Sequence, residues 1–299
     1  MIHKKSFSDN AKGIYFAILS AFFGALLVIL VRYLSQDFHL FFVVMVRNAL
    51  ALLMLAPQII HYRKDIFKTK RFNLHLFRGC NGLVSMYIWF YIVTILPLSE
   101  AVSISFVVPI LSSLVAIYYL KEVVKKEIIF ACILGLVGVL VILRPGFREF
   151  NTAYLFSFAS LILWTVSNVA IKVMTRTEKP QTIVVYMTII MLVTSIPFGL
   201  FYMEPLSFRD LTLFIALGLV SNLLHFSISN AYKLADLSYV QPFDFTRLVF
   251  TALLAYFVFG EVIDSWVIVG SIVILFGVIL ILPKRKRGRK PKVLAPEEL

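Results

Sequence analysis

The stretch that decides the fold is LSEAVSISFVVPILSSLVAIYYLKEVVKKEIIFACILGLVGVLVIL, residues 98–143, which returns without a gap 139 residues later. In this alignment 14 of 46 positions are identical, and Glu122 falls on Glu261. Farther upstream, a shift of 140 residues aligns Arg32 with Lys172. Two apolar halves with similar sequences indicate a duplicated membrane domain. Internal repeats of this kind are typical of secondary transporters.

The composition agrees with a membrane protein. The mean hydropathy is +0.91, 60% of the residues are hydrophobic and only 15% are charged. A soluble fold of this length cannot bury that much apolar surface, so the long uncharged runs indicate helices that cross about 30 Å of hydrocarbon at about 1.5 Å per residue. The sequence predicts ten such helices, at Gly13–Leu34, His39–Ile60, Leu74–Leu96, Ser99–Leu120, Ile128–Leu143, Thr152–Val173, Thr182–Tyr202, Leu211–Tyr232, Leu237–Phe259 and Val267–Leu282.

Other interpretations of these runs fit less well. The runs are continuous rather than alternating, and an open sheet edge cannot lie in lipid, which argues against strands. The first run is long, lacks a small-residue cleavage site and reappears as the sixth run, so it is not a removable signal peptide. Cys80 and Cys132 lie in or beside predicted helices and are interpreted as packing residues rather than a disulfide framework.

The distribution of basic residues predicts the orientation. With the N-terminus inside, 23 of the 29 Lys and Arg residues fall on the inner face, Arg78 among them, and three fall on the outer face. The other three, Arg32, Arg47 and Arg247, lie within helices. This asymmetry places both termini in the cytoplasm, in what we expect to be a bacterial inner membrane. The basic tail is interpreted as an anchor against anionic lipid rather than a nucleic-acid-binding patch, so we expect no nucleic-acid partner.

Each half contains five predicted helices, so the second half should cross the membrane in the opposite sense to the first. We expect a cytoplasmic N-terminal segment (residues 1–12), two five-helix repeats (13–144 and 152–282) and a basic cytoplasmic tail (283–299). Two inverted halves can adopt each other's conformations, which gives an inward-open and an outward-open state from one architecture. The predicted fold class is an all-α integral membrane protein with ten transmembrane helices.

Short motifs in both halves resemble a known family. They are LFRG at 76–79, LSEA at 98–101, FVVP at 106–109 and LKE at 120–122, then LSYVQPFDF at 237–245 and FGE at 259–261. These motifs resemble the two repeats of the EamA family of the drug/metabolite transporter superfamily, over nearly the whole chain from residue 13 to residue 283. The resemblance implies a central cavity lined by helices one to four and six to nine, and alternating access by rocking of the two halves.

The resemblance also implies that the fifth and tenth helices pack outside the cavity or form a homodimer. The residues of the fifth helix agree with this role. Ala131, Gly135 and Gly138 make a small-residue face on which another helix can approach closely.

Several predicted helices carry polar side chains that should face a shared interior. Polar groups in hydrocarbon must face protein or water, so five helices with such groups indicate a wet central cavity, although each group alone also fits an interhelical hydrogen bond. The two tryptophans among them either stack on a substrate or form interfacial belts. The candidate substrate-binding residues are Arg47, Asn81, Trp89, Ser103, Trp164, Asn168, Asn222, His225, Gln241, Asp244 and Arg247.

Charges in the predicted membrane region are the sharpest indication of a site. Arg247 lies about 15 Å along its helix from Leu237, too deep to reach the interface, and Asp244 lies three residues earlier on the same face. The two form either a self-neutralised structural pair or a substrate-binding or proton-coupled pair. Arg47 is interpreted as a docking point for a carboxylate, with a partner in the first helix or Glu100 as the alternative.

Other polar residues near the helix ends receive structural interpretations. Arg32 is expected to reach the outer interface as an anchor, and Glu122 and Glu261 are expected to cap the N-terminus of the next helix. His225 either relays protons or is an ordinary packed histidine. Pro242 is expected to loosen the ninth helix, which is typical of transport sites.

The sequence contains no motif of an enzyme, a metal site or a cofactor site. It has no HExxH, Walker loop or nucleophile elbow, and its seven aspartates form no magnesium-binding pair. We therefore expect no catalytic residue, no metal and no cofactor, and as partners a small-molecule substrate and the lipid bilayer. A non-transporting receptor or scaffold is the alternative from another class, but it would need neither inverted halves nor a polar interior.

The charges also indicate the class of cargo. Arg32, Arg47 and Arg247 stand against Asp244 and Glu100, and this mixture of signs fits a zwitterionic or amphipathic, amino-acid-like metabolite. Within the EamA family the chain is also similar to S-adenosylmethionine carriers of intracellular bacteria in its HLFRG segment, so the resemblance makes S-adenosylmethionine a candidate cargo. A drug or amino-acid exporter of the same fold is the alternative, and the direction of transport and proton coupling stay open.

Overall fold

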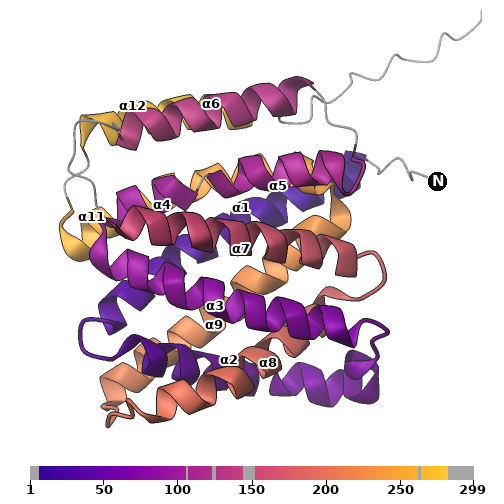
Figure 1. Ribbon diagram of the computed structural model, residues 1–299, viewed down its shortest axis with the longest axis vertical. Coiled ribbons are helices and arrows are strands. Elements are labelled where there is room, and N and C mark those ends of the chain that lie inside the picture. The colour runs from indigo at the N-terminus through magenta and orange to yellow at the C-terminus, as the bar shows by residue number, and fades with distance from the viewer. Residues whose placement is uncertain (1–6, 106, 123–125, 144–151, 262–263, 282–299) are drawn as a thin grey trace, which may run out of the picture.

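The computed structural model describes residues 7–105, 107–122, 126–143, 152–261 and 264–281, and every element in these ranges is a helix. Each of the ten predicted runs coincides with a helix or with consecutive helical pieces (Figure 1). The first half contains α1 (Phe7–Leu34), α2 (Leu40–Tyr62), the short 3₁₀ helix η1 (Arg63–Phe67), α3 (Phe72–Ile95), α4 (Leu98–Ser105), α5 (Val107–Tyr118) and α6 (Lys126–Leu143). The second half contains α7 (Ala153–Met174), α8 (Pro180–Leu200), α9 (Phe208–Leu234), α10 (Leu237–Val240), the 3₁₀ helix η2 (Gln241–Phe245), α11 (Thr246–Phe259) and α12 (Ser265–Ile281).

Within the described residues, seven helical segments are long and apolar enough to cross a membrane. They are Asp9–Leu34, Leu40–Phe67, Phe72–Ile95, Ala153–Met174, Pro180–Leu200, Phe208–Leu234 and Leu237–Phe259. Two further apolar helices, Val107–Tyr118 and Ser265–Leu280, are shorter. The chain is therefore an all-helical, multi-pass membrane protein.

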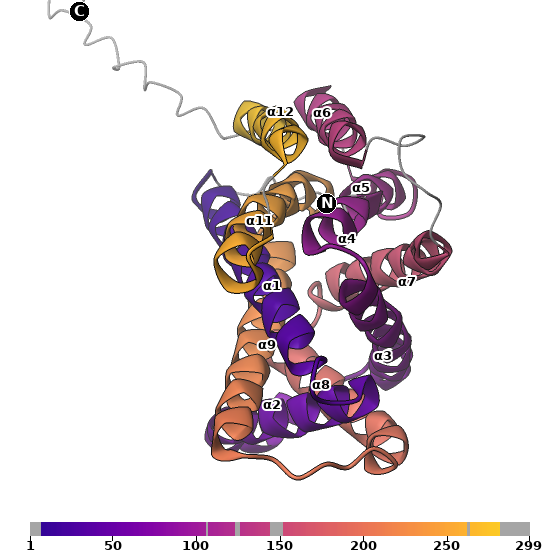
Figure 2. The same ribbon diagram turned by 90° about the vertical axis from the view of Figure 1, so that its left-hand side faces the viewer.

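The packing of the helices is the same when the two halves are exchanged. α1 packs on α9 as α3 packs on α7, and α2 packs on α9 as α3 packs on α8. The equivalent helices α2 and α8 pack on each other, and so do α6 and α12. Such reciprocal contacts are expected when two similar units are related by a two-fold axis. Figure 2 shows many of the helices nearly end-on, with α6 and α12 set apart at one end of the molecule.

The small residues predicted on α6 are used inside the chain. A Cβ atom at Gly138 would lie 2.7 Å from the carbonyl oxygen of Gly270 and 2.6 Å from Ile274, both on α12. One at Gly135 would lie 2.4 Å from the ring of Phe245 in η2. The face expected to permit close approach of another helix therefore contacts α12 and η2, and a homodimer through the outer sides of α6 and α12 stays a prediction.

The ninth predicted helix is broken near its start, as its proline suggested. The segment passes from α10 through the 3₁₀ turn η2 into α11, and Pro242 lies in η2. Proline has no backbone N–H and crowds the preceding turn, so an uninterrupted α-helix is disfavoured at this point. The break brings Asp244 and Arg247 to the junction of η2 and α11.

Replacing Gly138 by valine should separate α6 from α12. The added side chain would meet the backbone carbonyl of Gly270, which cannot yield as a flexible side chain does. We expect the free energy of unfolding to fall by about 1–3 kcal/mol, measured as a lower thermal midpoint of the purified protein in detergent. Val137→Leu adds bulk on the exposed side of α6 and should leave the midpoint unchanged. An equal midpoint for both variants would contradict this packing.

Candidate functional site

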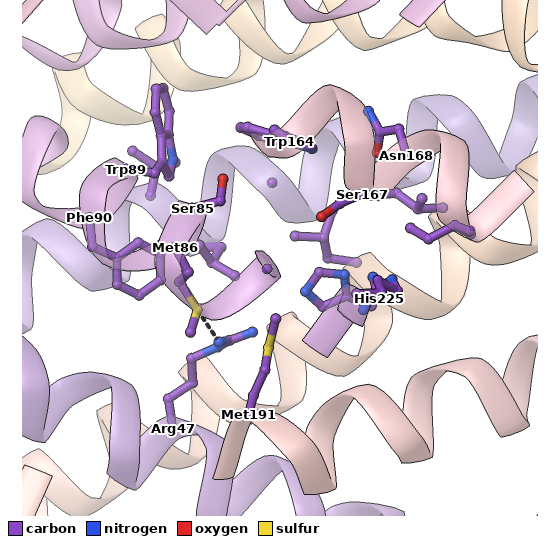
Figure 3. Close-up of a pocket in the computed structure, with 18 of the residues that line it drawn as sticks. Arg47, Ser85, Met86, Trp89, Phe90, Trp164, Ser167, Asn168, Met191 and His225 are labelled. Carbon is purple, nitrogen blue, oxygen red and sulfur yellow. Dashed lines mark hydrogen bonds between the residues drawn. The ribbon is translucent and has the colours of Figure 1, made fainter. Parts of the chain in front are cut away.

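A cavity lies between the two halves of the chain (Figure 3). Its walls come from α1, α2 and α3 of the first half and from α7, α8, α9 and α11 of the second. Ligand sites in membrane transporters with internal repeats lie at the interface of the repeats, where this cavity also lies. The cavity is therefore the candidate functional site.

Six of the predicted site residues line this cavity, namely Arg47, Trp89, Trp164, Asn168, His225 and Arg247. A smaller recess shares Trp164, Asn168 and Arg247 with it and adds Gln241 and Asp244. The side chain of Ser103 lies outside the described residues. Eight of the eleven candidates thus line the cavity or the recess beside it.

The two remaining candidates join helices instead of lining the cavity. Asn81 on α3 donates from Nδ2 to the carbonyl oxygen of Leu163, at 2.7 Å, and to Oγ of Ser167, at 2.8 Å. Asn222 on α9 donates from Nδ2 to the carbonyl oxygen of Ala51 on α2, at 2.8 Å. For these two residues the geometry favours the interhelical hydrogen bond over direct substrate contact.

Asp244 and Arg247 form an ion pair in the wall that the cavity shares with the recess. Nη2 of Arg247 lies 2.5 Å from Oδ1 of Asp244, and the arginine is almost completely buried. Its guanidinium carbon lies 5.0 Å from the ring centroid of Trp164, close enough for a cation–π interaction. A glycine on α1 makes room for this group, since a Cβ atom at Gly24 would lie 2.8 Å from Nε of Arg247.

Arg47 has only neutral partners among the described residues. Its Nη1 donates to Oδ1 of Asn48 at 3.1 Å and contacts the sulfur of Met86, and its Nη2 donates to Oγ of Ser221. These partners come from α2, α3 and α9, so the partner expected in the first helix is not the one observed. The side chain of Glu100, the other alternative, lies outside the described residues.

Arg78 is a cavity residue that the sequence analysis did not select. It lies on α3, is only 4% exposed and lines the cavity, although we had counted it with the cytoplasmic cations. The signal was its position inside the third predicted run, about 6 Å past its start. This signal is weak, because an arginine at that depth can also reach the interface, and the packing of α3 is what turns it toward the cavity.

The tryptophans are wall residues rather than members of an interfacial belt. Trp89 is buried, and its ring centroid lies 5.7 Å from that of Trp164 in an edge-to-face arrangement. His225 stands in the same cavity, and its Nδ1 has no hydrogen-bond partner among the described residues. Among those residues no three His, Cys, Asp or Glu side chains come together to hold a metal ion.

Two equivalent glutamates each bind the N-terminus of a helix in the other half. Glu122 accepts hydrogen bonds from the backbone N–H groups of Leu237 and Ser238, both at 3.0 Å, and from Oγ of Ser238 at 2.8 Å. Nζ of Lys172 lies 3.8 Å from the same carboxylate and 2.5 Å from the carbonyl oxygen of Ala235. We call this group the Glu122 clasp.

The Glu261 clasp repeats this arrangement with the halves exchanged. Oε1 of Glu261 accepts from the backbone N–H of Leu98 at 3.5 Å and lies 2.6 Å from Nη1 of Arg32. The same Nη1 lies 3.5 Å from the carbonyl oxygen of Leu96. Arg32 is therefore not the free interfacial anchor that we expected, because it forms an ion pair.

The turns that present the two glutamates are also equivalent. Lys121 and Gly260 both have positive φ, 56° and 67°, and each directly precedes its glutamate. The backbone N–H of Glu122 then donates to the carbonyl oxygen of Ala116, and that of Glu261 donates to the carbonyl oxygen of Ala255, six residues earlier in each case. Both glutamates cap helix N-termini, as expected. Glu122 caps α10 and Glu261 caps α4, however, and neither caps the next helix in sequence.

Replacing Asp244 by asparagine should destabilise the protein by leaving Arg247 buried without a counter-charge. We expect a loss of about 2 kcal/mol in the free energy of unfolding, measured from thermal midpoints in detergent. Adding Arg247→Met to that variant removes the unpaired charge and should recover most of the loss. Strictly additive effects across the four members of this cycle would contradict a direct pair.

Comparison with known proteins places the chain in a family. It is 26% identical to the S-adenosylmethionine uptake transporter of Rickettsia prowazekii, over 94% of this chain and 95% of that protein. It is also 26% identical to the riboflavin transporter of Vibrio cholerae, over 85% and 86% of the two chains. One crystal structure shares the fold with a TM-score of 0.74 at 16% identity, covering 92% of this chain and 96% of the other. The sequence profile of the EamA-like transporter family matches residues 11–144 and again 151–282, so the chain belongs to the EamA-like transporter family, as its motifs predicted.

Proposed function

We propose that this protein is a secondary transporter that moves a small metabolite across the inner membrane by alternating access. The observation that carries the proposal is the cavity between the two halves, with buried cations and aromatic rings from both of them in its walls. Transporters built from internal repeats bind their substrates at the interface of the repeats. The family and the named relatives are transporters, so the chain is not an enzyme.

The proposed topology has ten transmembrane helices, arranged as two inverted five-helix repeats (13–144 and 152–282) with both termini in the cytoplasm. Three observations support it. Ten helical runs are present, the packing of the helices repeats when the halves are exchanged, and the basic residues are concentrated on one predicted side. In this topology the lipid bilayer covers the exposed apolar side chains of the outer helix faces.

The two clasps supply the physical basis for alternating access. They lie at the two ends of the segment Leu237–Phe259, whose 23 residues would span about 34 Å as a helix. Each clasp joins the halves through charged groups and helix N-terminal N–H groups, which favour a carboxylate. Opening the cavity at either end requires the halves to separate there, and therefore breaks the clasp of that end.

The two clasps differ in their burial. The side chains of Glu122 and Lys172 are 7% and 6% exposed, whereas those of Glu261 and Arg32 are both 23% exposed. The end that holds the Glu122 clasp, which the charge distribution assigns to the cytoplasm, is therefore the more tightly closed. In the proposed cycle this conformation is closed toward the cytoplasm.

Neutralising Glu122 and neutralising Glu261 should favour different states, the first open to the cytoplasm and the second open to the outside. A reporter cysteine in the cavity, Ile228→Cys in a Cys80→Ser, Cys132→Ser background, is labelled with an impermeant maleimide from each side of the membrane. Glu122→Gln should raise labelling from the cytoplasmic side and Glu261→Gln labelling from the outside, each about fivefold if a clasp contributes about 1 kcal/mol.

The control for this experiment is Glu204→Gln, an exposed glutamate outside both clasps, which should leave labelling from either side unchanged. If both clasp variants raised labelling from the same side, the clasps would not be the gates of an alternating-access cycle.

The relatives suggest candidate substrates. They include four named S-adenosylmethionine uptake transporters, three named riboflavin transporters and one named pseudopaline exporter. We propose S-adenosylmethionine as the first candidate, because it combines a flat ring with an amino-acid group, and riboflavin as the second. An exporter of drugs or amino acids with the same fold is the alternative, whereas a receptor would bind such a molecule without moving it.

Purified protein in proteoliposomes should accumulate a labelled substrate over time, relative to protein-free liposomes. We expect radiolabelled S-adenosylmethionine to be transported, with riboflavin tested in parallel. Arg247→Ala and Asp244→Ala should lower the initial rate about tenfold or more, because both residues hold the wall around the substrate. Lys68→Ala, on an exposed loop, should transport at the normal rate. Saturable binding of either compound without any flux would favour a receptor and overturn the proposal.

A further inference from the structure

The walls of the central cavity carry three positive charges and, among the described residues, no acidic side chain. The charges belong to Arg47, Arg78 and Arg247. Asp244 balances Arg247 from the adjoining recess. Arg47 and Arg78 are left with two charges that no ion pair among the described residues balances, although both arginines are more than nine-tenths buried.

The two arginines also retain unused hydrogen-bond donors. Nε and Nη1 of Arg78 and Nε of Arg47 are buried and have no hydrogen-bond partner among the described residues. Buried N–H groups are almost always paired in native proteins, so unpaired ones call for a partner that binds from outside the chain. Water can satisfy such donors while the cavity is open, but it cannot balance their charge.

The chemistry of this missing partner follows from the guanidinium group. Its planar fork of N–H donors matches the two oxygens of a carboxylate or phosphate, and such charge-assisted hydrogen bonds are the strongest available to it. The other polar groups nearby, such as Ser85 and Ser167, are neutral and cannot supply a counter-charge. Only an anionic group balances two buried guanidiniums.

The aromatic side chains indicate how the rest of the ligand lies. Figure 3 shows Trp89 and Trp164 on the side of the cavity opposite Arg47, with Met86 and Met191 nearer the arginine. An indole face accepts flat rings, and thioether sulfurs adapt to irregular apolar groups. The two tryptophans can therefore receive a ring on the side opposite Arg47, with the paired Arg247 beside Trp164.

We propose that Arg47 and Arg78 bind an oxyanion, a carboxylate or a phosphate, of the transported metabolite, whose ring system packs at Trp89 and Trp164. The inference rests on the proposed function, since it assigns the orientation of the substrate in that same cavity. It revises the set of charges expected from the sequence, because Arg78 joins the cavity wall while Arg32 is engaged in the Glu261 clasp. A ligand that carries such an oxyanion should bind better than a matched ligand that lacks it.

Matched probe pairs test this site by equilibrium binding to the purified full-length protein in detergent. The pairs are nicotinate with nicotinamide, which isolates a carboxylate, and adenosine monophosphate with adenosine, which isolates a phosphate. Binding is measured by tryptophan fluorescence in a Trp266→Phe background, so that only the two cavity tryptophans report. We expect the anionic member of at least one pair to bind about tenfold more tightly or better, and the pair that responds identifies the oxyanion.

Two substitutions at position 78 separate a binding role from a structural one. Arg78→Met should abolish the preference for the anion and raise the thermal midpoint, since it removes an unbalanced buried charge. Arg78→Lys keeps the charge but loses the planar fork, so an intermediate preference is expected. Arg176→Met, an exposed arginine outside the cavity, is the matched control and should leave the preference intact.

The results distinguish the anion site from the proposed function. If both members of each pair bind equally, or if the preference survives in Arg47→Met and Arg78→Met, the anion site is wrong even when proteoliposomes show flux. If the preference holds and depends on the two arginines but no substrate crosses the bilayer, the site stands and the transport proposal falls.

Discussion

A charged side chain cannot face hydrocarbon without a large free-energy cost, and this constraint organises the whole bundle. The cations near the helix ends are matched with carboxylates of the other half, as in the pairs of Arg32 with Glu261 and of Lys172 with Glu122. A hydrogen bond between Nε2 of His75, on α3, and Oε2 of Glu178, which follows α7, also joins the halves, at 2.5 Å. Because each ion pair joins one half to the other, the same contact neutralises a charge and holds the two halves together. The arginines of the central cavity are the exceptions, since among the described residues only one of the three, Arg247, has a counter-charge.

The two-fold relation between the halves explains why the same device occurs twice. A glutamate after a left-handed turn binds the first N–H groups of the equivalent helix in the other half, and a cation at the end of α1 or α7 lies beside it. In two inverted repeats, each end of the molecule presents the same local structure with the roles of the halves reversed. A contact that closes one end in one state is then available, from equivalent residues, to close the other end in the alternate state. The unequal burial of the two clasps is consistent with the alternating-access cycle that we propose.

Much of the fold could be predicted from the sequence, because hydropathy and chain repetition act on long segments. Each of the ten apolar runs corresponds to helical structure, and the proline of the ninth run marks the break at η2. The predictions that were wrong concern single side chains, because their contacts depend on which helices, distant in sequence, pack against each other. Arg78 lies close enough to a helix start to pass for a cytoplasmic cation, and its role depends on which face of α3 turns inward. The glutamates after α5 and α11 were predicted to cap something, but the helix that each caps is two or more segments away in the other half.

The residues of the central cavity do not follow the two-fold relation that relates the two clasps. By the repeat alignment, Arg47 corresponds to Met187 and Arg247 corresponds to Val108, so their charges have no counterparts in the other half. A gate has to work at both ends, which keeps its residues equivalent. A substrate bound between the halves has no two-fold symmetry of its own, so its charged and flat parts meet different side chains on the two sides. Duplication of the backbone thus suits the motion, while the divergence of individual cavity residues suits the recognition of one asymmetric molecule.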